Sequence, residues 1–300
     1  MLIVSSEPFA TVKAKTTLQT GMVSLTFDDG REGQRTLAAD ILKSCNLNGT
    51  AFDYITSLSQ GPSFLSLTQL RELHDSYGWE IGDHTYSHPH LGSLNNGQLQ
   101  REIVDSKNQF SRLGFNVETF AYPYSEGSEN PTIAKLVKEN YLGARSSGTS
   151  QAAYLYDETA NIFNIVANNV ANTTRPETVR TWVDQAISQK KWLILTFHEI
   201  VLDNPALDTF YTARDLQSIV AYVCQKVALG TLVTPTFKQG IETLTNTTTQ
   251  NKWQSLLVNP LLLTSFFASA VFIGFVELLR KWRRSTVAQS KKAGYDRTQE

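Results

Sequence analysis

Short apolar runs alternate with amphipathic segments along most of the chain. A compact apolar run bounded by turn residues predicts a strand, and apolar positions repeating every three to four residues predict a helix. The predicted strands are residues 21–27, 50–55, 80–83, 119–121, 143–145, 162–166, 192–197 and 231–234. The predicted helices are residues 36–45, 67–76, 98–113, 131–140, 176–189 and 212–227. About seven repeats of strand and helix predict an α/β fold with a parallel sheet closed into a barrel.

A different apolar pattern lies near the C-terminus, where residues 253–276 carry no charge. As a helix, about 24 residues would extend ~36 Å, enough to cross a hydrocarbon core of ~30 Å. Flanking tryptophans and a following basic run favour a transmembrane helix over residues 253–279. The alternative is a buried core helix, because polar residues and a proline shorten the strictly apolar run.

These patterns divide the chain into five predicted segments. They are an N-terminal extension (1–19), a catalytic domain (20–242), a linker (243–252), the transmembrane helix (253–279) and a basic tail (280–300). The basic tail predicts a single-pass membrane protein with a cytoplasmic C-terminus and an extracytoplasmic catalytic domain. No export signal is visible in the first ten residues, which lack both a basic start and a long apolar run.

The composition of the chain excludes several classes of protein. Apolar residues make up 41% of the chain and charged residues 18%, so it can bury a core and is not disordered throughout. The formal net charge is −1, and the charge of the chain before the basic tail is negative, which argues against a nucleic-acid partner. Two cysteines, Cys45 and Cys224, exclude a disulfide-rich scaffold. They form either one disulfide in an oxidising compartment or two buried thiols.

Side chains that can act as bases, acids or metal ligands follow several of the predicted strands. Asp28 and Asp29 end the first strand, His84 and His88 follow the third, and His198 ends the strand at 192–197. The carboxyl ends of parallel barrel strands meet on one face, so we expect these side chains to converge. Two imidazoles and one carboxylate form a metal set with open coordination positions. The second carboxylate then stays free to act as a base.

Three segments carry a resemblance to a known family. SLTFDDG (24–30), HTYSH (84–88) and LILTFH (193–198) resemble the first, second and fifth motifs of the polysaccharide deacetylases, carbohydrate esterase family 4, or NodB-homology domains. The resemblance spans roughly residues 20–245. It implies a distorted (β/α)₇ barrel, here followed by the transmembrane helix, and one divalent metal. Zinc is the usual ion, with Co²⁺ or Ni²⁺ as alternatives that the same ligands suit.

Position by position, the resemblance implies a role for each motif residue. Asp28 would be the general base and His198 the general acid. The metal would be bound by Asp29, His84 and His88.

The third motif differs from that of many members of the family. Ala121 stands where many members have Arg, as in a branch with F-A-Y-P-Y, and no D-x-x-D-W motif is present. The resemblance implies that the backbone N–H of Tyr124 donates to the oxyanion and that Thr196 replaces a Leu beside the acetyl methyl. Tyr122 is a candidate for stacking on a sugar ring. Arg145 could supply the missing cation to the base, or could be a surface residue.

The predicted activity is metal-dependent hydrolysis of a non-peptide carbon–nitrogen bond. The expected substrate is an N-acetylglucosamine-containing polysaccharide at the cell surface, so the expected partners are an N-acetylated glycan and, through the C-terminal helix, a lipid bilayer. One alternative is hydrolysis of another amide or ester by the same site. Another is a catalytically idle carbohydrate-binding surface protein, which the departures from the motifs favour.

Overall fold

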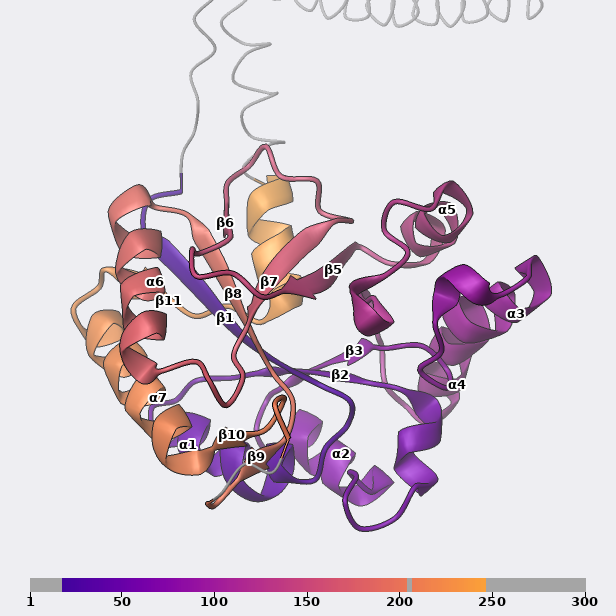
Figure 1. The fold of residues 1–300 in the computed structure, drawn as a ribbon, viewed down its shortest axis with the longest axis horizontal. Coiled ribbons are helices and arrows are strands. Elements are labelled where there is room, and N and C mark those ends of the chain that lie inside the picture. The colour runs from indigo at the N-terminus through magenta and orange to yellow at the C-terminus, as the bar shows by residue number, and fades with distance from the viewer. Residues whose placement is uncertain (1–17, 204–206, 247–300) are drawn as a thin grey trace, which may run out of the picture. The chain divides into compact units, whose positions relative to one another are not determined.

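Seven parallel strands close into a ring in the computed structural model, which describes residues 18–203 and 207–246 (Figure 1). The ring closes where residues 22–27 of the first strand pair with residues 192–197. In ring order the strands are β1 (Gly21–Asp28), β2 (Thr50–Asp53), β3 (Glu80–Asp83), β4 (Thr119–Ala121), β5 (Gly143–Gly148), β7 (Ile165–Asn169) and β8 (Trp192–Phe197). The predicted barrel is confirmed.

Four shorter strands add to this ring. β11 (Leu232–Val233) pairs with the start of β1, and β6 (Leu155–Tyr156) lies antiparallel on β8. β9 (Ile200–Val201) and β10 (Tyr211–Thr212) form a separate parallel pair. β6, β9 and β10 are absent from the sequence prediction because two residues are too few to show a period.

Helices cover the outside of the barrel. Figure 1 shows α6 and α7 along one side and α3, α4 and α5 along the other. The α-helices are α1 (Ala39–Lys43), α2 (Leu67–Asp75), α3 (Asn96–Gln100), α4 (Ser106–Arg112), α5 (Pro131–Asn140), α6 (Pro176–Gln189) and α7 (Ala213–Ala228). Two π-helical turns, η1 (Gln34–Ala38) and η4 (Arg101–Asp105), and three 3₁₀ turns, η2 (Ile55–Ser59), η3 (Leu91–Ser93) and η5 (Pro123–Ser125), complete the described elements.

The alternation of side chains along β1 explains how the core is divided. Val23, Leu25 and Phe27 point outward and pack in the core beneath the helices. Met22 belongs to a second cluster, with Ile194 of β8, inside the barrel. Because the last inward position of β1 is occupied by Asp28, the strand brings a carboxylate to the C-terminal mouth of the barrel.

The opposite, N-terminal mouth is closed by helical residues 237–246. Phe237 is fully buried and packs against the rings of Trp192 and Phe52. Its backbone N–H donates to Thr50 Oγ1 (2.9 Å), at the start of β2. The helix therefore fills this end of the barrel, and the predicted site residues lie at the other end.

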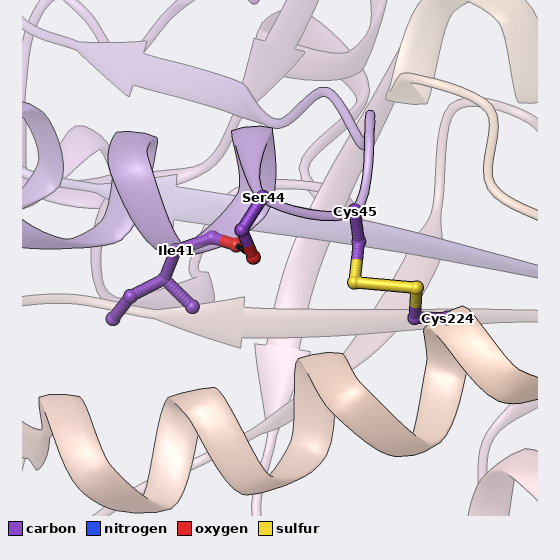
Figure 2. The surroundings of a disulfide bond; sticks show 4 residues. All are labelled: Ile41, Ser44, Cys45 and Cys224. Atoms are coloured by element: carbon purple, nitrogen blue, oxygen red, sulfur yellow. Dashed lines mark hydrogen bonds between the residues drawn. A yellow bond between two sulfur atoms is a disulfide. The ribbon is translucent and has the colours of Figure 1, made fainter.

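A disulfide joins Cys45 and Cys224, as Figure 2 shows. Cys45 follows α1 and Cys224 lies in α7, and their Cα atoms are 5.8 Å apart. Of the two alternatives that the sequence left open, the structure therefore has the bonded one.

The predicted transmembrane helix, residues 253–279, lies outside the described residues, as do the basic tail and most of the N-terminal extension. Within residues 18–203 and 207–246, no helix has the length and apolar character needed to span a bilayer. The predicted fold class is therefore corrected in one part. The barrel is present, but the described residues give no support for a membrane helix after it. The predicted contact with a lipid bilayer loses its support for the same reason.

Candidate active site

Two strand ends supply the polar centre of the C-terminal mouth. β1 ends at Asp28, which is 4% exposed, and the chain then turns through Asp29 in the left-handed region (φ 72°). β3 is separated from β1 by β2 in the ring, and His84 follows it directly, 3% exposed. A left-handed non-glycine residue is strained, which is a frequent property of functional sites. The turn aims the Asp29 carboxylate at the imidazoles instead of continuing the strand.

Three ligand atoms converge at this point. Oδ1 of Asp29 lies 3.3 Å from Nε2 of His88 and 3.6 Å from Nε2 of His84, and the two Nε2 atoms are 3.1 Å apart. Nδ1 of His84 lies 2.8 Å from the carbonyl oxygen of Ala121, to which it donates, so Nε2 is left with a free lone pair. The structure thus brings together the three residues predicted as metal ligands.

This triangle has the dimensions of a tetrahedral metal site. Nitrogen and oxygen ligands at about 2.0–2.2 Å from zinc lie roughly 3.3–3.5 Å apart in a tetrahedron. The observed separations of 3.1 to 3.6 Å match that spacing. The residues present therefore fit a divalent ion bound by two imidazoles and one carboxylate, with positions left for water and substrate.

The charges of the three groups support each other. Burial would raise the pKa of Asp29, but hydrogen bonds from His84 and His88 and the charge of His198 hold that pKa well below its ordinary value. Burial would lower the pKa of His84, but Asp29 and the charge of Asp28 raise it. Asp29 is consequently a carboxylate at neutral pH, the form that binds cations.

Arg145 of β5 lies on Asp28. Its Nη1 donates to Oδ2 of Asp28 (3.1 Å), and its Nη2 donates to Oδ1 of the same carboxylate. The guanidinium is 1% exposed and stacks on the ring of Phe52, 4.4 Å from the centroid. Of the two alternatives that the sequence left open for Arg145, the structure has the buried partner of Asp28 and not the surface residue.

His198 follows β8 at the same mouth. Its charge contributes to the low pKa of Asp29, which places it near the ligands. Its Nδ1 is buried and has no hydrogen-bond partner among the described residues.

Tyr124 forms the exposed rim of the site. It lies in η5 in the left-handed region (φ 55°), and its side chain is 53% exposed. Its ring stacks on His90, with centroids 3.9 Å apart, and meets the ring of His88 at 4.7 Å. His90 is therefore a neighbour of the site and is not one of the three residues of the ligand triangle.

Two predicted substrate contacts lie deeper than expected. Tyr122 is 2% exposed and packs in the core beneath α3, η4 and α5, with its hydroxyl donating to the carbonyl of Phe163 (3.2 Å). Its ring has no free face for a sugar, so that prediction is wrong. Thr196 is also fully buried, and its Oγ1 lies 3.1 Å from Oγ1 of Thr26 inside the barrel.

Two further residues shape the site. Tyr54, just after β2, lies with its ring 5.3 Å from that of His88 and is 7% exposed. Asp83, the last residue of β3, accepts a hydrogen bond from the N–H of Thr85 (2.8 Å). Burial raises the pKa of Asp83 to about 7. A tyrosine after a strand is an unspecific signal, so the sequence did not single out Tyr54.

A sequence model of the polysaccharide deacetylase family matches residues 15–142, which include both aspartates and both ligand histidines. Over 110 residues the chain is 32% identical to a peptidoglycan-N-acetylglucosamine deacetylase of Bacillus cereus, covering 36% of this chain and 38% of that protein. Over 125 residues it is 31% identical to the peptidoglycan-N-acetylglucosamine deacetylase PgdA of Listeria monocytogenes, covering 41% and 24%. The chain thus spans well under half the length of these curated relatives.

Among solved structures, the chain is similar to the Xyl-CE4 domain of a multidomain xylanase from the hindgut metagenome of Trinervitermes trinervoides. The TM-score is 0.50 at 16% identity, over 75% of this chain and 91% of that domain. At this identity the likeness concerns the fold alone. Residues 15–142 therefore match the polysaccharide deacetylase family, and the barrel and the converging motif residues agree with that match.

Proposed function

We propose that the chain is a metal-dependent deacetylase that hydrolyses N-acetyl groups on an N-acetylglucosamine-containing polysaccharide. One observation carries the proposal: three ligand atoms within 3.6 Å of one another lie at the same mouth of the barrel as a buried Asp28–Arg145 pair. The relatives are peptidoglycan-N-acetylglucosamine deacetylases, which favours peptidoglycan as the polysaccharide.

A divalent ion at this site supplies Lewis-acid polarisation of the amide carbonyl and a lower pKa for water. The residues of the chain do the rest. Asp28, held by Arg145, takes a proton from the attacking water. The N–H of Tyr124 donates to the oxyanion as the C–O bond forms. His198 gives a proton to the nitrogen as the C–N bond breaks, so that acetate and a free amine leave.

The ion that we propose is zinc. Two imidazole nitrogens and one carboxylate oxygen are a common ligand set for catalytic zinc. Co²⁺ and Ni²⁺ suit the same donors, so metal reconstitution should include all three.

We also propose that the barrel acts outside the cytoplasm, at the cell surface. A disulfide such as Cys45–Cys224 persists in oxidising compartments and is rare in the cytosol.

An acetate-release assay on the full-length chain tests the function. We expect release from peptidoglycan or from N-acetylglucosamine oligomers, loss of release in a chelator, and recovery on adding Zn²⁺. Asp28→Asn should lower kcat by about 100-fold or more, because it removes the proton acceptor. Its matched control is Asp75→Asn, an exposed carboxylate at the end of α2.

Three outcomes would overturn the proposal. Full activity in chelator would exclude the metal role. Absence of acetate release with zinc loaded, together with glycan binding, would favour an idle carbohydrate-binding protein, and release from other amides or esters alone would favour a different substrate class.

A further inference from the structure

The loop that carries both ligand histidines is held in an unfavourable conformation. Residues 84–88 form neither helix nor strand. Thr85 (φ 76°) and His88 (φ 60°) both lie in the left-handed region, which is unfavourable for a non-glycine residue. Such a loop persists only where other contacts fix it, so the contacts of this loop decide where His88 points.

Those contacts come largely from Glu102, in the π-helical turn η4. Its Oε2 accepts from the backbone N–H of Ser87 (2.8 Å), and its Oε1 accepts from Oγ of Ser87 (2.8 Å). Its carbonyl oxygen accepts from the N–H of Tyr86 (3.0 Å). Three hydrogen bonds thus join one residue of a neighbouring element to the middle of the loop.

Glu102 is 7% exposed, and both of its carboxylate oxygens are committed to the loop. Hydrogen bonds to an ionised acceptor are roughly twice as strong as neutral ones. A π-helical turn inserted between α3 and α4 is a feature found most often at functional sites. The turn therefore has a role here, because it carries the carboxylate that reaches the loop.

The remaining hydrogen bonds of the loop are partly local. Asp83 accepts from the N–H of Thr85 (2.8 Å), and Thr85 Oγ1 accepts from the N–H of His88 (2.9 Å).

Others come from η2, where the N–H groups of Ile55 and Thr56 donate to the carbonyl oxygens of Thr85 (3.3 Å) and Tyr86 (3.0 Å). The Glu102 carboxylate differs because it binds Ser87, the residue directly before His88.

We infer that Glu102 is a positioning residue for the metal site, which fixes Ser87 and so aims Nε2 of His88 at the point shared with Asp29 and His84. The inference rests on the metal binding of the proposed function. Partners of metal ligands usually change metal affinity by about 10- to 100-fold when removed, and we expect the same for Glu102.

The test is the dissociation constant for Zn²⁺, measured on the full-length chain by competition with a chromophoric chelator. We expect Glu102→Ala to raise the constant by about 10- to 100-fold. Glu102→Gln keeps one acceptor for Ser87 and should raise it less. The matched control, Asp105→Ala, removes an exposed carboxylate from the same turn and should leave the constant unchanged.

Each result has one meaning. If the wild-type chain binds zinc and the folded Ala variant binds within twofold of it, the inference is wrong. If circular dichroism shows that the Ala variant is unfolded without metal, the Gln variant is used in its place. A Zn²⁺ dissociation constant of the Gln variant within twofold of the wild-type value would then contradict the inference. If the wild-type chain binds no metal, the proposed function fails first, and the two failures are thereby distinguished.

Discussion

Asp28 and Arg145 meet at the centre of the site although 117 residues separate them in the chain. Each is nearly inaccessible to solvent, so each has lost most of its hydration. Two parallel hydrogen bonds between the guanidinium and the carboxylate offset that loss, a geometry that Lys cannot reproduce. The pair therefore fixes the orientation of the proposed base and compensates its charge.

Replacing Arg145 by Met should leave Asp28 as a buried carboxylate without its cation. We expect the free energy of unfolding to fall by about 3–5 kcal/mol. We also expect kcat to fall at least tenfold, because the base loses its orientation. Urea unfolding and the acetate assay measure the two effects. Arg145→Lys keeps the charge but not the planar guanidinium, so its stability and its kcat should lie between those of the wild type and of the Met variant. A Met variant as stable as the wild type would contradict this account.

At the level of single residues, sequence reasoning succeeded where motif and strand end coincide. Asp29, His84 and His88 were placed together because each follows a short, clearly bounded strand. Arg145 was left open, since the register of β5 around the barrel is not readable from the sequence. Tyr122 was misplaced because the turn after β4 directs its ring into the core. The carbonyl partner of His84 carries no side-chain signal at all.

Among the secondary-structure elements, those with strong boundary signals were predicted best. The ranges 80–83, 119–121, 131–140 and 176–189 agree with the observed β3, β4, α5 and α6. The range 98–113 was predicted as one helix but is divided by η4. Apolar spacing near 3.6 residues cannot signal a single π turn, because one extra residue shifts the pattern too little.

The loop between β1 and η1 depends on a glycine. The N–H of Gly33 donates to Oε1 of Glu199 (2.9 Å), the residue after His198. A Cβ at Gly33 would collide with that carboxylate and with the carbonyl oxygen of Ile200. The loops after β1 and after β8 can therefore approach each other only because this position has no side chain.

Gly33→Ala should push these two loops apart. We expect a loss of about 1–3 kcal/mol in the free energy of unfolding and a lower kcat, because His198 moves relative to Asp28. Thermal unfolding and the acetate assay provide the measurements. Gly92→Ala is the control, since a Cβ there meets no atom within 4 Å and should change neither quantity. Equal behaviour of the two variants would refute the packing argument.

For the molecule as a whole, the number of strand–helix repeats was enough to predict a closed barrel. The chain builds it by pairing β1 with β8, and it seals one mouth with residues 237–246. That helical plug could not be predicted, because its apolar residues form a core only after the ring has closed. The bond between Cys45 and Cys224 was equally open, since sequence separation says nothing about proximity.

This disulfide ties α7, near the end of the barrel, to the loop after α1, near its start. The two cysteines are 179 residues apart in the chain. In the chain-entropy model, a cross-link that closes a loop of this length raises the free energy of the unfolded chain by about 5 kcal/mol at most. Replacing both cysteines by Ser should therefore lower the free energy of unfolding by several kcal/mol, as measured by urea denaturation. A reducing agent should destabilise the wild-type chain and leave the double variant unaffected. Two titratable thiols in the native protein purified without reductant would show that the bond does not form, and would remove the support it gives to a site of action outside the cytoplasm.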